Sequence, residues 1–317
     1  MKVLNINDIK RLQCPTAVTV GMFDGVHRGH RSLVAHLLRL AAQRELEPVV
    51  VTFDRHPRQV LTPDDAPQLL TTTDERVALL EECGVPTVVM VPFDEATAAM
   101  SACRFAEQVL CERLDMRLLV LGYDNQFGSR SNNDFDRLPA LAAERGFAME
   151  RDAVLHVEGV AVSSTQIRKA LLAGDVRRAA AMLGAPYGLS GVVEHGRHVG
   201  SSMGFPTANI GLCDPCKLLP ASGVYAMRVA VDGHQVAAMG NLGAQPTFGQ
   251  QAPALEVHLL GYEGDLYGRR LKVEFLDRLR DIRAFDGADQ LADQPRCDRE
   301  RVLQLMDDEG RRECLTQ

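Results

Sequence analysis

The sequence predicts an α/β domain built on a doubly wound parallel sheet, followed by a small antiparallel β-barrel with a C-terminal helix. Three observations predict this fold class. The first half alternates short apolar runs with amphipathic stretches, the second half alternates strand-length runs with turn residues, and helical spacing returns only near the C-terminus. The first pattern is typical of βαβ units and the second of small barrels.

The apolar runs of the first half lack polar alternation, which indicates strands that are buried on both faces. Between them, the apolar residues of segment 31–44 recur at helical spacing. Thr72 and Glu75 form a capping box that opens a helix ending near Gly84, and Ser101 can cap the next helix. Sheets of this kind bind ligands at the carboxyl ends of their strands. The strands are expected at residues 17–20, 49–53, 87–91 and 118–121.

The second half changes character after about residue 186, where strand patterns are separated by turn residues. The pair Asp232-Gly233 between two such runs predicts a β-hairpin with a type I′ turn. We therefore expect two domains, residues 1–185 and 186–317. The strands of the second domain are expected at residues 224–231, 235–239, 255–260 and 271–275, and its helix near residues 302–306.

Composition narrows the classes of partner. At 317 residues, 46% hydrophobic and 24% charged, the chain resembles an ordinary globular protein with two domains. A net charge of -7 argues against nucleic acid as the main partner, whereas a nucleotide needs only local positive charge and backbone N–H groups. No segment approaches the roughly 20 apolar residues of a membrane span, so we expect a cytoplasmic protein with no membrane partner. Cys213 and Cys216 are expected to lie in an ordinary loop as reduced thiols.

The strongest motif is Gly21-Met-Phe-Asp-Gly-Val-His-Arg-Gly-His30, which leads from the first strand into a helix. Gly25 and Gly29 allow the backbone to approach a ligand closely. His27 and His30 share one face of a helix N-terminus, where backbone N–H groups favour phosphate. Imidazole donors there could stabilise charge developing on an α-phosphate and a leaving pyrophosphate. The alternative is that one histidine caps the helix and the other is solvated.

Two later segments support a nucleotide site. Leu-Gly-Tyr-Asp-Asn-Gln-Phe-Gly at 121–128 follows a strand and would lie at the same sheet edge. Val-Ser-Ser-Thr-Gln-Ile-Arg at 162–168 opens a helix, which places hydroxyls and an arginine where a second phosphate could bind. Taken alone, residues 163–165 are an ordinary N-cap run.

The second domain carries a weaker pattern of the same kind. Closely spaced glycines precede Gly-Phe-Pro-Thr-Ala-Asn at 204–209 and could fold over phosphates. Thr207 and Asn209 offer neutral oxygen ligands that suit Mg²⁺. Glu256, on the open face of a strand, could take the proton from an attacking hydroxyl. The alternative is that these glycines form turns and the glutamate is solvated.

The first-domain motifs, with Thr-Phe-Asp-Arg-His-Pro at 52–57, resemble the nucleotidylyltransferase superfamily and, within it, the bacterial bifunctional riboflavin kinase/FAD synthetase family. The resemblance covers roughly residues 15–285. It implies that the N-terminal domain adenylylates FMN to FAD with release of pyrophosphate. The implied flavin- or adenine-side residues are Asp124 and Asn125. The implied ATP-binding residues are Gly21, Phe23, Gly25, His27, His30, Ser164, Thr165 and Arg168.

The second-domain motifs resemble the riboflavin kinase half of the same family, which implies phosphorylation of riboflavin to FMN. Thr207 and Asn209 would bind Mg-ATP, Glu256 would act as general base on the ribityl 5′-hydroxyl, and Arg280 would lie near the flavin or phosphates. One departure is Ser201, where many members have arginine; Arg197 or His198 could supply the lost phosphate contact. The implied phosphate-loop glycines are Gly196, Gly200 and Gly204.

The sequence thus predicts a bifunctional transferase that uses ATP and Mg²⁺ and handles riboflavin, FMN and FAD. Three alternatives stay open on sequence alone. One is a monofunctional adenylyltransferase whose second domain only binds flavin. Another is a flavin or nucleotide sensor without turnover. The third is a nucleotidylyltransferase that acts on another acceptor.

Overall fold

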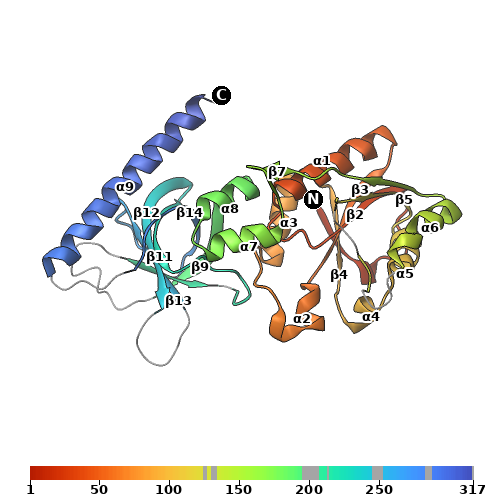
Figure 1. The fold of residues 1–317 in the computed structure, drawn as a ribbon, viewed down its shortest axis with the longest axis horizontal. Coiled ribbons are helices and arrows are strands. Elements are labelled where there is room, and N and C mark those ends of the chain that lie inside the picture. Colours follow the sequence, from red (N-terminus) through yellow and green to blue (C-terminus); the bar gives the residue numbers. More distant parts are fainter. Residues whose placement is uncertain are drawn as a thin grey trace. The chain divides into compact units, whose positions relative to one another are not determined.

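A computed structural model of the chain describes residues 1–123, 127–129, 134–194, 207–212, 214–244, 253–282 and 288–315. The chain divides into two compact units, Met1–Ser164 and Thr165–Gln317 (Figure 1). This division groups helices α7 (Ser164–Leu172) and α8 (Val176–Leu183) with the second unit, apart from the first residue of α7. The domain boundary expected after residue 185 stays a prediction.

The first unit is built on a six-stranded sheet in the order β1-β4-β3-β2-β5-β6, with every neighbouring pair parallel. The predicted doubly wound parallel sheet is therefore confirmed. Its strands are β1 (Lys2–Asn5), β2 (Thr16–Val20), β3 (Glu47–Phe53), β4 (Thr87–Val91), β5 (Met116–Leu121) and β6 (Ala148–Arg151), with the hairpin β7 (His156–Val157) and β8 (Val160–Ala161) outside the sheet. Its helices are α1 (Arg28–Gln43), α2 (Pro57–Leu61), α3 (Thr73–Glu82), α4 (Glu95–Ala98), α5 (Ala102–Phe105), the π-helix η3 (Ala106–Cys111) and α6 (Leu138–Arg145), with short 3-10 turns η1 (Ile6–Asp8), η2 (Pro63–Asp65) and η5 (Phe135–Arg137).

Helices cover both faces of this sheet (Figure 1). Helix α1 packs Leu33 and Leu37 on one face, against strand residues such as Val50 and Leu118. Phe105 and Leu138 pack on the other face with the alternate strand residues. Because each face buries its own apolar cluster, the strands carry continuous apolar runs, as predicted.

The predicted helix caps are present. Thr72 Oγ1 accepts the Glu75 N–H at 3.2 Å and Glu75 Oε2 accepts the Thr72 N–H at 3.0 Å, which completes the capping box of α3. Gly84 follows that helix with a φ of +80°. Ser101 Oγ accepts the Arg104 N–H at the start of α5. These caps fix where helices begin beside the sheet edge.

The second unit holds α7, α8, a closed six-stranded barrel in the order β10-β13-β12-β11-β14-β9, and the long helix α9. The predicted antiparallel barrel and C-terminal helix are confirmed. Asp232 and Gly233 have φ of 51° and 80°, as the predicted type I′ hairpin turn requires. Tyr225 and Phe275 fill the barrel interior, while Val302 of α9 packs outside it. The elements are β9 (Tyr187–Glu194), β10 (Ala208–Leu212), β11 (Gly223–Val231), β12 (His234–Ala244), β13 (Pro253–Leu259), β14 (Arg270–Arg280) and α9 (Ala288–Leu315).

Candidate active sites

The β2–α1 turn, residues 21–27, has an irregular backbone. Phe23, Gly25 and Val26 have φ of 50°, 86° and 36°, all in the left-handed region. That region is strained for a β-branched residue such as Val26, and such strain persists only when the surroundings fix the conformation. The side chains of Phe23 and Val26 are fully buried in the cluster under α1. The turn is therefore anchored from below by apolar packing.

His27 and His30 lie together at the start of α1. His27 is the N-cap, and its Nδ1 accepts the His30 N–H at 3.2 Å. The two rings stack with centroids 3.6 Å apart at 14°, and the Phe23 ring packs against His30. The stacked pair places both imidazoles beside the backbone N–H groups of the helix N-terminus, the arrangement predicted for phosphate binding.

His30 is held in the neutral form. Burial, followed by the neighbouring His27, keeps its pKa well below the usual 6.5. Its Nδ1 is buried and has no hydrogen-bond partner among the described residues. A buried polar atom left without a partner costs roughly 1–3 kcal/mol, so this atom is suited to a ligand hydrogen bond.

Two glycines of the motif leave little room for a side chain. A Cβ on Gly21 would lie 3.2 Å from the Phe23 ring, and a Cβ on Gly29 would lie 3.2 Å from His27 Nδ1. Glycine at these positions therefore keeps the Phe23 and His27 rings where they are.

The other residues predicted for the first site are placed as follows. Ser164 Oγ donates to the Asp24 carbonyl at 2.9 Å, which ties the last residue of the first unit to the turn. Thr165 and Arg168 follow in α7, within the second unit, so their place at this site stays a prediction. Asp124 and Asn125 lie outside the described residues. Arg151 Nη1 donates to the carbonyls of residues 122 and 123, at 2.9 Å each, and fixes the backbone just before them.

Three further residues hold the turn and were not predicted from the sequence: Asp24 within it, and Thr71 and Arg76 from a distant segment. The Asp24 carboxylate accepts the N–H groups of Leu70 and Thr71, at 3.0 and 2.9 Å. Asp24 belongs to the glycine motif at residues 21–30, so its place in the sequence could have indicated a role at this site. Thr71 and Arg76 carry no such signal, because only the fold brings segment 70–76 to the turn.

In the barrel, four polar residues form one row across neighbouring strands. Asn209 on β10 lies opposite Glu256 on β13 and Glu194 on β9, and Glu256 lies opposite Asn241 on β12. Residues directly opposite each other share a face of the sheet. Their neighbours Leu255 and Val257 are buried, so the polar row lies on the outer face. This row is the second candidate site.

Glu256 and Asn209 are available to a ligand. Both are half-buried, and within the described part of the unit neither side chain hydrogen-bonds to the protein. Asn209 sits between two carboxylates, Glu194 and Glu256, in the register of the barrel. A half-buried carboxylate without a protein partner can accept a proton from a bound hydroxyl.

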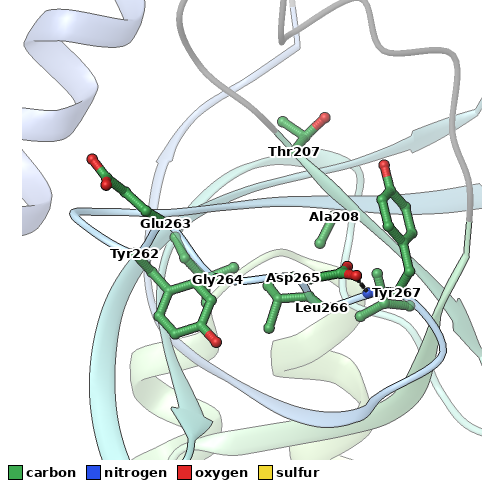
Figure 2. Close-up of a pocket in the computed structure, with 10 residues that line it drawn as sticks. Thr207, Ala208, Tyr262, Glu263, Gly264, Asp265, Leu266 and Tyr267 are labelled. Carbon is green, nitrogen blue, oxygen red and sulfur yellow. Dashed lines mark hydrogen bonds between the residues drawn. The ribbon is translucent and has the colours of Figure 1, made fainter.

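Thr207 lines a pocket of about 220 Å³ formed with the β13–β14 connection. Figure 2 shows Thr207 and the ring of Tyr267 pointing the same way, while Asp265 turns back to accept the Tyr267 N–H at 3.0 Å. Apolar walls with a few polar groups are typical of small-molecule sites. The lining residues are Val193, Thr207, Ala208, Leu259, Tyr262, Glu263, Gly264, Asp265, Leu266 and Tyr267.

Arg280 is oriented by helix α9. Its Nε and Nη2 donate to Asp298 Oδ2 at 3.0 and 2.8 Å, and Gln294 Nε2 donates to Asp298 Oδ1 at 3.0 Å. Asp298 is almost fully buried. The predicted contact of Arg280 with flavin or phosphate stays a prediction.

The remaining second-domain predictions fall largely outside the described residues. These are Gly196, Arg197, His198, Gly200, Ser201, Gly204 and Cys213. Cys216 is exposed. Over the described ranges there is no group of three or more His, Cys, Asp or Glu side chains that could hold a metal ion. No helix within those ranges is long and apolar enough to cross a bilayer.

Comparisons with known proteins match both halves of the chain. A family model described as FAD synthetase matches residues 9–166, and one described as riboflavin kinase matches residues 183–306. Curated bifunctional riboflavin kinase/FMN adenylyltransferases are 37% identical in Pseudomonas fluorescens, over 86% of this chain and 87% of the relative, and 32% identical in Bacillus subtilis, over 96% and 98%. A crystal structure of a macrolide-efflux protein from Streptococcus pneumoniae superposes with a TM-score of 0.86 at 31% identity, covering 95% of this chain and 98% of that one.

The fold and the two matched domains define an ATP-dependent transferase of flavin biosynthesis. The chain belongs to the bifunctional riboflavin kinase/FMN adenylyltransferase family. It phosphorylates riboflavin to FMN and adenylylates FMN to FAD, with ATP as the donor in both steps. Enzymes of these families generally use a divalent metal with ATP. The three alternatives left open by the sequence are therefore set aside.

Proposed function

We propose that adenylylation takes place at the β2–α1 turn and phosphorylation at the outer polar row of the barrel. The observation that supports this division is that each place holds a polar group without a protein partner among the described residues: His30 Nδ1 in the first unit and the Glu256 carboxylate in the second. A buried polar atom without a partner, such as His30 Nδ1, is uncommon in native proteins and calls for an explanation, which a bound ligand would supply.

In adenylylation, a phosphate oxygen of FMN attacks the α-phosphorus of ATP, and the bond to pyrophosphate breaks. Stacked His27 and His30 donate N–H groups to the oxygens on which negative charge increases. The low pKa of His30 keeps its imidazole neutral, and a neutral imidazole still carries one N–H that it can donate. Asp124 and Asn125 lie on the flavin or adenine side. The ATP-binding set is Gly21, Phe23, Gly25, His27, His30, Ser164, Thr165 and Arg168.

In phosphorylation, Glu256 takes the proton of the ribityl 5′-hydroxyl, the oxygen attacks the γ-phosphorus of ATP, and ADP leaves. The pocket that Thr207 lines receives the nucleotide, because Thr207 lies two residues before Asn209 of the polar row. Arg280, held by Asp298, lies on the flavin or phosphate side. The phosphate-loop glycines are Gly196, Gly200 and Gly204.

Magnesium is the metal that the donor set fits best. Thr207 and Asn209 offer a hydroxyl and an amide oxygen two residues apart, and Mg²⁺ prefers a few hard oxygens together with substrate phosphates and water. When bound, Mg²⁺ screens phosphate charge and orients the leaving group.

A cytoplasmic location follows from the need for ATP in both steps, and the net charge of -7 disfavours nucleic acid as a partner. We expect no membrane partner, and we place the domains at residues 1–185 and 186–317.

The test is a time course with riboflavin, ATP and Mg²⁺, in which the flavins are separated by chromatography. FMN should rise first and then decline as FAD accumulates. Removal of the metal with a chelator should stop both steps, and added Mg²⁺ should restore them. If riboflavin stays unchanged while supplied FMN becomes FAD, the roles given to Glu256, Thr207 and Asn209 are wrong.

A further inference from the structure

Thr71 and Arg76 lie outside the ATP-binding motifs, yet both contact the β2–α1 turn. Thr71 follows η2, and Arg76 lies in the first turns of α3, so the fold alone brings them there. Both side chains are buried, and Arg76 is only 2% exposed. A buried arginine is costly unless its hydrogen bonds are well satisfied, so its position calls for a physical reason.

The Thr71 hydroxyl makes two hydrogen bonds of opposite sense. It donates to Asp24 Oδ1 at 3.1 Å and accepts the Gly25 N–H at 3.0 Å. A hydroxyl oxygen can do both at once, whereas an apolar side chain of the same shape, such as valine, can do neither. Both contacts fall within the segment from Phe23 to Val26, in which Phe23, Gly25 and Val26 are left-handed, so Thr71 fixes the strained part of the turn directly.

Arg76 fixes the entry to the same turn. Its Nη1 donates to the Met22 carbonyl at 3.0 Å, and its Nη2 donates to the Phe53 carbonyl at 2.7 Å. One guanidinium thus joins the ends of β2 and β3. A lysine ammonium cannot reproduce this planar fork. Burial lowers the pKa of Arg76, whereas Asp24 and Asp54 raise it.

We propose that Thr71 and Arg76 are positioning residues for adenylylation: they hold the β2–α1 turn so that His27 and His30 face the α-phosphate. This inference rests on the role proposed above for the histidine pair. Neither residue needs to touch ATP. Their effect is on the geometry of the turn, and a misplacement of about 1 Å in a catalytic group can cost roughly 100-fold in rate.

The test compares Thr71→Val with Thr71→Ser in the full chain. Valine keeps the shape and removes the hydroxyl, whereas serine keeps the hydroxyl. We expect Thr71→Val to lose about 100-fold in kcat for adenylylation of supplied FMN, with the KM for FMN unchanged. Thr71→Ser should retain most of the wild-type kcat. Riboflavin phosphorylation, measured on the same samples, should be unchanged in both variants.

A folded Thr71→Val protein with wild-type adenylylation would overturn the proposal, as would a Thr71→Ser protein that is as slow as the valine variant. If Thr71→Val does not fold, Arg76→Lys decides in the same way: full adenylylation overturns the proposal, and a loss in kcat with the charge retained supports it. His30→Ala is assayed in parallel. If His30→Ala keeps its adenylylation activity, the proposed role of the histidine is wrong. If His30→Ala loses that activity while Thr71→Val keeps it, only the inference about Thr71 and Arg76 is wrong.

Discussion

In the first unit the proposed ATP-binding groups Gly21 to His27 lie on an irregular backbone turn, whereas in the second unit Glu256 and Asn209 project from regular strands. The turn depends on left-handed residues, two crowded glycines and hydrogen bonds from a distant segment. The barrel row depends only on strand register. The position of the groups in the first site therefore depends on the backbone conformation of the turn, whereas the properties of the second site depend on which side chains its strands carry.

This difference predicts different responses to mutation. A side chain on a regular strand can be exchanged for an isostere without moving its neighbours, so activity should report its chemistry alone. A residue of the turn acts partly through geometry, so even substitutions that add one methyl group should reduce the rate. Because one chain carries both activities, each serves as the internal control for the other.

The largest expected effect is that of Glu256→Gln. Loss of a general base costs about 100- to 10,000-fold, so FMN formation from riboflavin should nearly stop. Conversion of supplied FMN to FAD should continue at the wild-type rate. Both are measured by separating flavins after incubation with ATP.

Glu194→Gln is the matched control for this variant, since Glu194 lies in the same polar row on the other side of Asn209. It should retain phosphorylation. An equal loss in both variants would mean that the negative charge of the row matters, and that Glu256 has no particular role as base.

His30→Ala should give the reverse result. Removal of one preorganised donor from a site of developing charge costs roughly 100- to 1,000-fold, so FAD formation should fall by that amount while riboflavin phosphorylation is kept. His36→Ala is the control, because His36 lies on the same helix but pairs with Asp152. Unchanged FAD formation in His30→Ala would remove this histidine from the reaction.

The sequence predicted the parts of the fold that are decided locally. The runs that became β2 to β5 are apolar and buried on both faces, and Thr72 and Ser101 cap helices through neighbours in the chain. Strands β1 and β6 were missed, since these edge strands are short and carry Lys2, Asn5, Glu150 and Arg151. The hairpin β7–β8 has two residues in each strand, which is too short for any periodicity.

The candidate sites divide in the same way. The histidine pair and Glu256 were found because each belongs to a compact motif. Thr71 and Arg76 were missed because they reach the turn from about fifty residues away. The alignment of Glu194 and Asn241 with Asn209 and Glu256 depends on the pairing of four strands, which no local pattern specifies.

Gly29→Ala should have an intermediate effect. The added Cβ would lie 3.2 Å from His27 Nδ1, so the ring must shift by a few tenths of an ångström. We expect FAD formation to fall roughly tenfold, less than the hundredfold associated with a 1 Å misplacement. Alanine favours a helix over glycine by about 1 kcal/mol, so the free energy of unfolding should not fall. A slower and equally stable enzyme would show that the turn acts through geometry, whereas a wild-type rate would show that the His27 ring has room to adjust.

The smallest expected effect is the pH dependence of stability that comes from His30. Its pKa is lowered in the folded protein, so below the unfolded value of about 6.5 the unfolded chain binds a proton that the folded chain does not. The free energy of unfolding should therefore fall as pH decreases through 6.5, with a slope from this group of at most about 1.4 kcal/mol per pH unit. His30→Gln removes the titrating group and should be less sensitive between pH 7.5 and 5.5 in urea unfolding of the full chain. Parallel curves for the two proteins would mean that His30 titrates normally. The first site would then lack the desolvated imidazole that distinguishes it from the open polar row of the barrel.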